Sequence, residues 1–226
     1  TALMAAAQPE SPELRDYRTA VVQARGELGQ PRFYPGSPLL AAQTLRPQDR
    51  ALCCELIASE CRSLERTLKG FGRVRSVCDD GYRMLQASLP PPERRCLVLI
   101  DPPYENPAEE IAQALAAVDA ILARLANAVI ALWYPIKDER WLLPWQKRIE
   151  RRLAAPAAWL ELWFHPRDAR VARNGSGLLI MNPPYRFEQR AGAWQRELHA
   201  LLDAAGTGGS TVRTLVSEET AGHAGT

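Results

Sequence analysis

The chain has 226 residues, of which 46% are hydrophobic and 24% charged, and a formal net charge of +2, a composition typical of one large globular domain with a sizeable core. It contains no apolar run near the roughly 20 residues that a membrane-spanning helix requires, and its beginning does not resemble a signal peptide, so we expect a cytoplasmic protein without membrane association. The small net charge also excludes the strongly basic composition of many nucleic-acid binders.

The cysteines and histidines show no spacing typical of metal ligands. The three histidines are far apart, and the five cysteines form no C-x-x-C pair. Several cysteines lie inside apolar runs, which predicts reduced, small core residues and no metal site. They are Cys53, Cys54, Cys61, Cys78 and Cys96.

The first predicted helix begins at Ser11 and runs towards Gly29. Ser11 is a capping residue, and Pro12 suits the first helical position. A turn-rich segment, residues 32–38, then leads into a second helix. Ser37 precedes a proline in this segment, where it either caps the helix or contacts a ligand.

Two predicted strands, over residues 50–56 and 74–78, end in acidic residues. An acid at the end of the second strand of a nucleotide-binding fold characteristically binds ribose hydroxyls, which favours this role for Glu55. Asp80 can accept an adenine amino group, and Gly81 lets the backbone approach the ring. Each acid alone is more typical of a turn. A third acid, Asp101, ends the next predicted strand. We therefore favour the interpretation that the three acids line one ligand-binding site at the same edge of the sheet.

That next strand, Cys96–Ile100, is an unbroken apolar run that stops at Asp101-Pro102-Pro103-Tyr104, as a buried parallel strand opening onto a site does. The Asp101 carboxylate and the Pro102 carbonyl can accept both hydrogens of an exocyclic base amine, which aims the nitrogen lone pair at an electrophilic methyl group. Tyr104 offers a flat face for a base taken out of its stack. The alternative is an ordinary strand followed by a proline-stiffened turn.

The second half of the chain alternates predicted helices and strands. The helices cover residues 108–125, 141–153 and 186–202, and the strands cover residues 128–135, 159–164, 177–181 and 211–216. Two basic clusters are either solvated faces or phosphate-binding patches. The first consists of Lys147, Arg148, Arg151 and Arg152, and the second, in a predicted recognition loop over residues 165–176, of Arg167, Arg170 and Arg173.

A second proline pair, in Asn182-Pro183-Pro184-Tyr185, complicates the assignment. An amide oxygen also accepts a hydrogen bond, so Asn182 could hold an amine as Asp101 does. The order along the chain favours Asp101, because its strand directly follows the strands that end in acids. We expect Asn182 to be structural or to line the substrate site.

In combination these motifs resemble the RlmJ (YhiR) family, whose members are S-adenosylmethionine-dependent methyltransferases acting on an adenine amino group of bacterial large-subunit ribosomal RNA. The resemblance implies an α/β, Rossmann-like class I fold with a mostly parallel sheet of the seven-stranded type and an antiparallel strand near the C-terminus. It also implies that Asp101 is catalytic and that Ser37, Glu55, Asp80, Gly81 and Asp101 contact the cofactor. The matching segments are residues 32–38, Glu55, residues 80–81, 100–105, 131–135 and 180–185.

The resemblance fails at the front of the chain. The family's first strand and glycine-rich cofactor loop have no match before Arg32, and a sheet without its central strand would leave backbone groups unpaired. We infer that residues are missing there. The expected organisation is a helical insertion subdomain over 1–31, a methyltransferase domain over 32–217 and a tail over 218–226.

The leading hypothesis is methylation of the N6 amine of an adenine in 23S ribosomal RNA, with S-adenosylmethionine as cofactor and no metal. Catalysis is assigned to Asp101, Pro102 and Tyr104, and the expected RNA contacts are Tyr104, Lys147, Arg148, Arg167, Arg170 and Arg173. We expect a monomer that acts on protein-free RNA or an early assembly intermediate. The alternatives are methylation of DNA adenine and a non-catalytic RNA-binding module.

Overall fold

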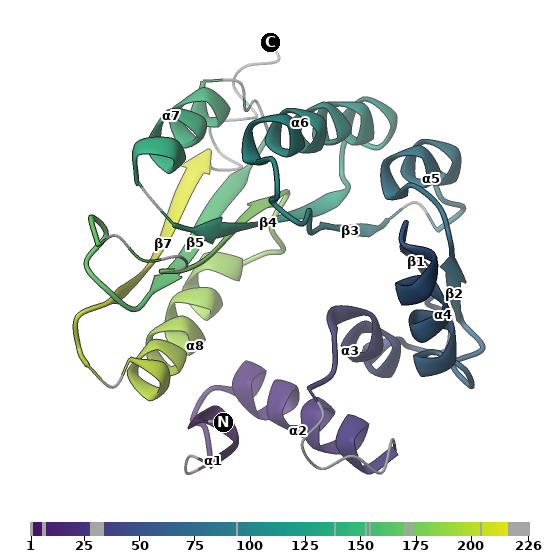
Figure 1. Ribbon diagram of the computed structural model, residues 1–226, viewed down its shortest axis with the longest axis horizontal. Coiled ribbons are helices and arrows are strands. Elements are labelled where there is room, and N and C mark those ends of the chain that lie inside the picture. Colours follow the sequence, from purple (N-terminus) through teal and green to yellow (C-terminus); the bar gives the residue numbers. More distant parts are fainter. Residues whose placement is uncertain are drawn as a thin grey trace. The chain divides into compact units, whose positions relative to one another are not determined.

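The computed structural model describes the chain in two compact units, residues Pro12–Leu89 and residues Thr1–Ser11 with Pro90–Thr226 (Figure 1). The structure describes all residues except 1, 6–7, 28–33, 94, 138, 152, 154, 170, 172–173, 204 and 217–226.

The smaller unit, Pro12–Leu89, is a short parallel sheet with helices between and around its strands. β1 and β2 pair in parallel, with Cys54 opposite Val77, so their carboxyl ends share one edge. Its elements are α2 (Pro12–Glu27), α3 (Ser37–Thr44), β1 (Ala51–Cys54), α4 (Ala58–Thr67), β2 (Val74–Val77) and α5 (Gly81–Ser88).

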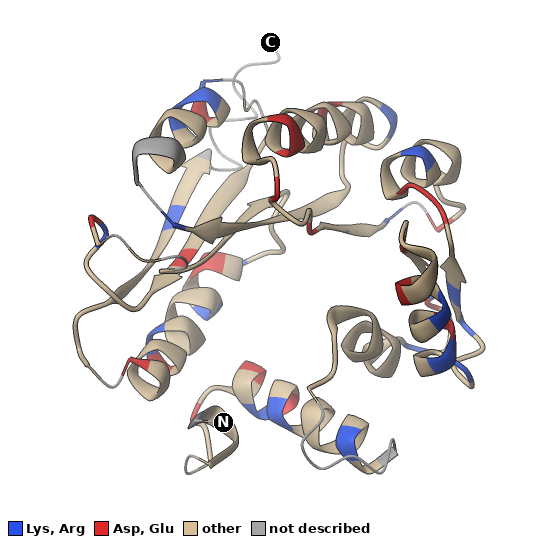
Figure 2. Cartoon of the chain, in the orientation of Figure 1, with Lys and Arg blue, Asp and Glu red and all other residues tan. Residues whose placement is uncertain are grey.

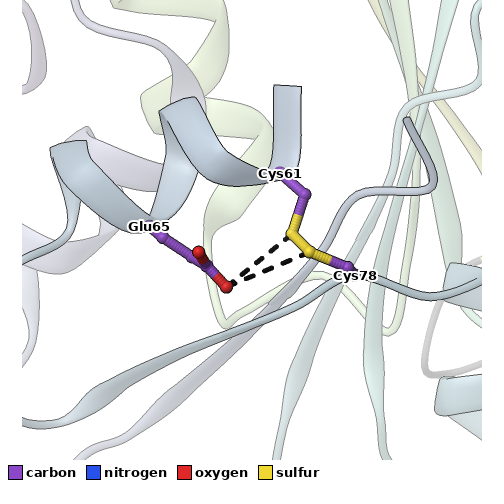
Figure 3. Close-up of side chains that lie close together, drawn as sticks. All are labelled: Cys61, Glu65 and Cys78. Atoms are coloured by element: carbon purple, nitrogen blue, oxygen red, sulfur yellow. Dashed lines mark hydrogen bonds between the residues drawn. A yellow bond between two sulfur atoms is a disulfide. The ribbon is translucent and has the colours of Figure 1, made fainter. Parts of the chain in front are cut away.

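A disulfide between Cys61 and Cys78 joins α4 to the residue that follows β2 (Figure 3). The Oε1 atom of Glu65 lies 4.0 Å from the Cys61 sulfur and 3.9 Å from the Cys78 sulfur. The prediction that all cysteines are reduced is therefore wrong for this pair. The pairing arises because the crossover helix folds back onto its strand, which spacing in the sequence does not reveal. Cys53, Cys54 and Cys96 have free thiols, as predicted.

The larger unit is built on a five-stranded mixed sheet in the order β3-β4-β6-β5-β7. β3 and β4 are parallel, whereas β6 is antiparallel to both β4 and β5, and β7 is antiparallel to β5. The strands are β3 (Leu97–Ile100), β4 (Val129–Ile136), β5 (Ala157–Trp163), β6 (Gly175–Met181) and β7 (Gly209–Val216), and the helices are α1 (Ala2–Ala5), α6 (Pro107–Arg124), α7 (Glu139–Glu150) and α8 (Phe187–Leu202).

Helices cover both faces of this sheet, with α6 and α7 on one side and α8 on the other (Figure 1). A strand covered on both faces buries side chains that point to either side, and β4 does so along most of its length. One core lies under α8 and contains Ala131, Ala158, Leu160, Ile180 and Ala191. Tyr134, Trp145 and Trp159 form an aromatic cluster with ring centroids 4.6 to 5.4 Å apart.

The architecture confirms the predicted α/β, Rossmann-like fold. It differs in detail from the expected mostly parallel sheet of the seven-stranded type, because the described strands form a two-stranded parallel and a five-stranded mixed sheet, and two strands in the C-terminal part, β6 and β7, are antiparallel where one was expected. The short helices α1 and α5 were not predicted. β3 lies at the end of its sheet, and its Leu97 and Leu99 side chains are 70% and 49% exposed. The missing first strand stays a prediction, as do the proposed domain boundaries. Within the described residues, no helix has the length and apolar character needed to cross a membrane.

The disulfide should stabilise the smaller unit measurably. It links residues separated by 17 positions, and a cross-link over such a loop contributes about 3 kcal/mol by restricting the unfolded chain. We predict that reduction, or replacement of both Cys61 and Cys78 by alanine, accelerates hydrogen exchange of the β1 and β2 amides about a hundredfold. The variant Cys53→Ala, which removes a free thiol, should retain the full response to reductant. Equal exchange rates with and without reductant in an oxidised sample would contradict the prediction.

Candidate functional site

Asp101 directly follows β3, at the end of the parallel β3–β4 pair. Ile100 lies opposite Leu132, so β3 ends beside the middle of the longer strand β4. The prolines fix φ at positions 102 and 103 and keep each preceding residue extended, which makes the turn stiff. Within the described part of the chain, neither the Asp101 carboxylate nor the Pro102 carbonyl takes part in a hydrogen bond. Two adjacent acceptors therefore remain available to a ligand.

Tyr104 anchors the far end of this turn. Its hydroxyl donates a 2.6 Å hydrogen bond to the Trp133 carbonyl, and the two rings meet edge to face with centroids 5.8 Å apart. The residue has a left-handed φ of 56° and is only 3% exposed. No pattern in the sequence predicted this anchoring role. The predicted stacking of a base on Tyr104 stays a prediction, and in this conformation the ring is covered by protein.

The electrostatic setting of Asp101 differs from that of a fully hydrated aspartate. The residue is exposed overall, but atoms packed around its carboxyl group displace part of its water and raise its pKa above the usual value. Desolvation strengthens any hydrogen bond that the ionised carboxylate accepts from a bound amine. The group is therefore suited to bind N–H donors.

Asn182 lies at the other end of the sheet from Asp101. It follows Met181, which pairs with Ile130 in an antiparallel register, so Asn182 lies level with Val129 at the start of β4. Asp101 follows Ile100, which pairs with Leu132 in a parallel register, and so lies level with Trp133. A difference of four positions corresponds to roughly 13 Å along a strand. The two motifs thus cannot hold the same amine, and the role of Asp101 stays a prediction.

The Asn182 side chain is used within the protein. Its Nδ2 donates to the carbonyls of Ala126 and Ala128 at 2.8 and 2.9 Å, and its backbone N–H donates to the Pro156 carbonyl at 2.8 Å. The side-chain bonds tie the end of β6 to the turn before β4, and the backbone bond ties it to the residue before β5. These bonds agree with the interpretation of Asn182 as a structural residue and not as part of the substrate site.

Glu55 and Asp80 lie at the shared carboxyl edge of β1 and β2. The Glu55 Oε1 accepts the Ile57 N–H at 2.8 Å, and the Asp80 Oδ1 caps α5 by accepting the Tyr82 N–H at 2.8 Å. Each acid thus uses one carboxylate oxygen to hold its own turn, and among the described residues its second oxygen has no hydrogen-bond partner, so a ligand could use it. The turn-forming and the ligand-binding interpretations are compatible. Asp101 belongs to the other unit, so the convergence of all three acids stays a prediction.

The local structure of the described residues explains neither the serine at position 37 nor the glycine at position 81, and their predicted contacts with the cofactor stay predictions. Gly36, not Ser37, is the capping residue of α3, and Ser37 is exposed at the first helical position. Gly81 begins α5, and an added Cβ there would make only an ordinary 3.6 Å contact with the Cys54 Cβ. Packing within the protein therefore does not demand glycine.

The predicted RNA contacts differ in their surroundings. Lys147 and Arg148 are exposed in the last turn of α7 (Figure 2). Arg167 forms a 2.6 Å ion pair with Glu161, which is 4% exposed, and lies over the Trp163 ring at 4.5 Å. Arg170 and Arg173 lie outside the described residues.

Glu161 is the centre of a buried polar network. Its Oε1 accepts hydrogen bonds from the Tyr134 hydroxyl at 2.8 Å and from the Gln146 Nε2 at 2.6 Å, while Arg167 pairs with Oε2. Burial, followed by the nearby carboxylate, raises the pKa of Tyr134 well above its usual value. Arg167 is thus the counter-ion of a buried acid, a role that the sequence pattern could not reveal.

A sheet with helices on both faces (Figure 1), in which the parallel strand β3 ends at an acidic turn, is typical of Rossmann-like enzymes, which bind their ligands at the carboxyl ends of parallel strands. The chain belongs to the family described as ribosomal RNA large subunit methyltransferase D, RlmJ, whose family model matches residues 4–216. It is therefore an enzyme of the methyltransferase class.

Individual relatives agree with this assignment. The chain is 35% identical to ribosomal RNA large subunit methyltransferase J of Escherichia coli strain K12 over 198 residues, which are 88% of this chain and 70% of the relative. It is 36% identical to the protein of the same name from Haemophilus influenzae over 191 residues, 83% of this chain and 66% of that relative. The crystal structure of protein LPL1258 from Legionella pneumophila is similar, with a TM-score of 0.78 and 27% identity, over 91% of this chain and 75% of that one.

The ion pair predicts that Arg167 contributes to stability. Arg167→Met would leave the buried Glu161 carboxylate without its cation, at a cost of about 2 kcal/mol. All six tryptophans lie in the larger unit, so urea unfolding followed by tryptophan fluorescence measures the loss. The control Arg148→Met removes an exposed cation and should change the free energy of unfolding little. Equal stability of the two variants would show that Arg167 is not required by Glu161.

Proposed function

We propose that this chain transfers a methyl group from S-adenosylmethionine to the exocyclic N6 amine of an adenine in large-subunit ribosomal RNA. Membership of the family supports the reaction class, and both curated relatives are named for large-subunit ribosomal RNA. The relatives favour neither DNA methylation nor a non-catalytic module. The observation that carries the proposal is the pair of available acceptors, the Asp101 carboxylate and the Pro102 carbonyl, on a stiff turn at a strand end.

These acceptors account for activation of the amine. An adenine amino nitrogen is a poor nucleophile because its lone pair is conjugated with the ring. When Asp101 and the Pro102 carbonyl each accept one of its hydrogens, the nitrogen is held in a geometry that directs the lone pair out of the ring plane. As the nitrogen took the methyl group from the sulfonium, with cleavage of the methyl–sulfur bond, the Asp101 carboxylate or water would accept the proton that the nitrogen releases along its hydrogen bond.

The residues of the smaller unit suit the cofactor, which supplies the electrophilic methyl group on a sulfonium. The remaining carboxylate oxygen of Glu55 would accept the ribose hydroxyls, and that of Asp80 the adenine amino group. Gly81 would allow close approach of the ring, and the exposed Ser37 hydroxyl is a further contact. Two observations on the described residues support this assignment. The second carboxylate oxygens of Glu55 and Asp80 accept no hydrogen bond there, and the packing around position 81 would also accommodate a larger residue than glycine.

The RNA contacts proposed for the backbone are Lys147 and Arg148. Contact of Tyr104 with the flipped base would require its ring, which is 3% exposed, to be uncovered when RNA binds. The two cations are exposed on one helix turn, where they would neutralise phosphates. Arg167 would act mainly through its pairing with Glu161, while Arg170 and Arg173 remain proposed contacts outside the described residues.

Replacement of Asp101 tests the mechanism. In the full-length protein, Asp101→Asn should lower methyl transfer to transcribed 23S ribosomal RNA at least about a hundredfold, since loss of one preorganised partner of the reacting group has effects of this size. RNA affinity should change little. Because its pKa is raised above 3.8, Asp101 should become protonated, and wild-type activity should decline, at a higher pH than for an ordinary aspartate. Undiminished turnover of Asp101→Asn would remove Asp101 from this role.

The same variant should be more stable than the wild type at neutral pH. The folded state raises the pKa of Asp101, so it binds a proton more tightly than the unfolded state, and stability falls as pH rises through the interval between the two pKa values. Asparagine does not ionise and avoids this loss. The urea concentration at the midpoint of unfolding should therefore be higher for Asp101→Asn than for the wild type at pH 7, and the two midpoints should become equal in acid. A variant less stable than the wild type at pH 7 would show that folding does not penalise the ionised carboxylate.

Substitution of Gly81 separates ligand binding from folding. Gly81→Ala should leave the stability unchanged or raise it by about 0.5 kcal/mol, because alanine favours a helix over glycine. The added methyl group should weaken binding of S-adenosylhomocysteine to the full-length protein about tenfold (~1.4 kcal/mol) in calorimetry. Gly72→Ala is the control, since no atom lies within 4 Å of an added Cβ there. Equal affinities of the two variants would place Gly81 outside the cofactor site.

A further inference from the structure

Tyr185 is the most exposed large hydrophobic residue in the described part of the chain, with 77% of its surface accessible. Its counterpart in the first proline motif, Tyr104, is 3% exposed and packs against Trp133. The two tyrosines thus follow the same proline pair but have opposite surroundings. The anchoring role of Tyr104 does not extend to Tyr185, whose exposure requires another explanation.

The turn that presents Tyr185 is rigid. Pro183 and Pro184 restrict the backbone before it, and Asn182 and Arg186 on either side adopt left-handed φ values of 49° and 57°. Residues other than glycine adopt this conformation at a cost of order 1 kcal/mol, and such strain is concentrated at functional sites. The Asn182 side chain holds the start of the turn, and a 2.9 Å bond from the Phe187 N–H to the Pro184 carbonyl holds its end. A ring on such a turn loses little entropy when a ligand binds.

A cation accompanies the exposed ring. The guanidinium carbon of Arg186 lies 5.1 Å from the centroid of the Tyr185 ring, within the range of a cation–π interaction. An accessible aromatic face next to a cation is the combination with which proteins bind single-stranded nucleic acid, because the base stacks on the ring and the cation meets the phosphate.

The location excludes a direct part in chemistry. The Asn182 motif leaves the sheet at the end opposite to Asp101, so a base on Tyr185 is not the base whose amine Asp101 holds. Tyr185 and Arg186 would instead bind another nucleotide of the same polymer. Their contribution should therefore appear in RNA affinity and not in the rate of the chemical step.

We propose that Tyr185 and Arg186 form a second RNA-binding site, which takes one unpaired nucleotide with its base on the Tyr185 ring and its phosphate at Arg186. The proposal rests on the proposed function in that it takes RNA as the substrate. It adds a contact on the sheet end opposite to the amine-binding turn.

Equilibrium binding to transcribed large-subunit ribosomal RNA tests the site without any need for turnover. Stacking of one base contributes ~1–3 kcal/mol, so Tyr185→Ala should weaken RNA binding by about 5- to 150-fold. Tyr185→Trp keeps an aromatic face and should retain the affinity. The control Val22→Ala, which trims a 55% exposed apolar side chain of the other unit, should bind as the wild type does.

The contribution of Arg186 can be measured separately, through the salt dependence of RNA affinity. Arg186→Gly suits the left-handed backbone and removes one cation, so the slope of log affinity against log salt should become shallower by about 0.7 to 0.9. Tyr185→Ala should leave this slope nearly unchanged. In methylation assays Tyr185→Ala should raise KM for RNA while kcat and S-adenosylhomocysteine affinity stay at the wild-type values.

The proposal is overturned if Tyr185→Ala binds naked RNA as tightly as the wild type does. If that variant instead loses affinity only for RNA carrying ribosomal proteins, the surface binds protein and the RNA assignment is equally wrong. Failure of the proposed function looks different: the wild type would transfer no methyl group to RNA, whatever residue occupies position 185.

Discussion

The hydrogen bond from the Tyr104 hydroxyl to the Trp133 carbonyl is the constraint on which the proposed amine-binding turn depends. It ties the residue after the two prolines to the neighbouring parallel strand, and the buried ring packs against Trp133. With φ restricted at both prolines and Tyr104 held in the left-handed region, the backbone between β3 and α6 has little freedom. The Asp101 carboxylate and the Pro102 carbonyl are thus positioned before a substrate arrives. Acceptors that need no reorganisation are the most effective way for a protein to stabilise a reacting amine.

Strand direction separates two motifs that the sequence makes almost identical. β3 runs parallel to β4 and β6 antiparallel to it, so the two proline pairs emerge at opposite ends of the sheet. The acidic motif keeps its carboxylate available and buries its tyrosine, whereas the second motif uses its amide to bind backbone carbonyls and exposes its tyrosine. One sequence string thereby serves two different purposes, set by the strand that delivers it.

Local sequence patterns predicted most of the fold and the positions of the acids. The strands before Glu55, Asp80 and Asp101 were predicted close to their observed ends, because a short run of strand-forming residues that stops at turn-forming residues is a local signal. Burial was predicted less well, since Leu97 and Leu99 of β3 are 70% and 49% exposed where a buried strand was expected. Contacts between distant residues leave no such signal. The Tyr104 anchor joins residues 29 positions apart, and the Cys61–Cys78 link and the Arg167–Glu161 pair depend on how a helix and a loop fold back onto strands. The helix α5 was missed because the acids before it were interpreted as ligand contacts, although Asp80 also caps that helix.

The central claim is that one turn holds both hydrogens of an adenine amine. A crystal structure of the full-length protein with S-adenosylhomocysteine and an adenosine-containing RNA fragment tests it most directly. The account predicts the adenine N6 atom within about 3.2 Å of both an Asp101 carboxylate oxygen and the Pro102 carbonyl oxygen. An adenine amine bound beside Asn182, or one turned away from Asp101 towards solvent, would contradict it.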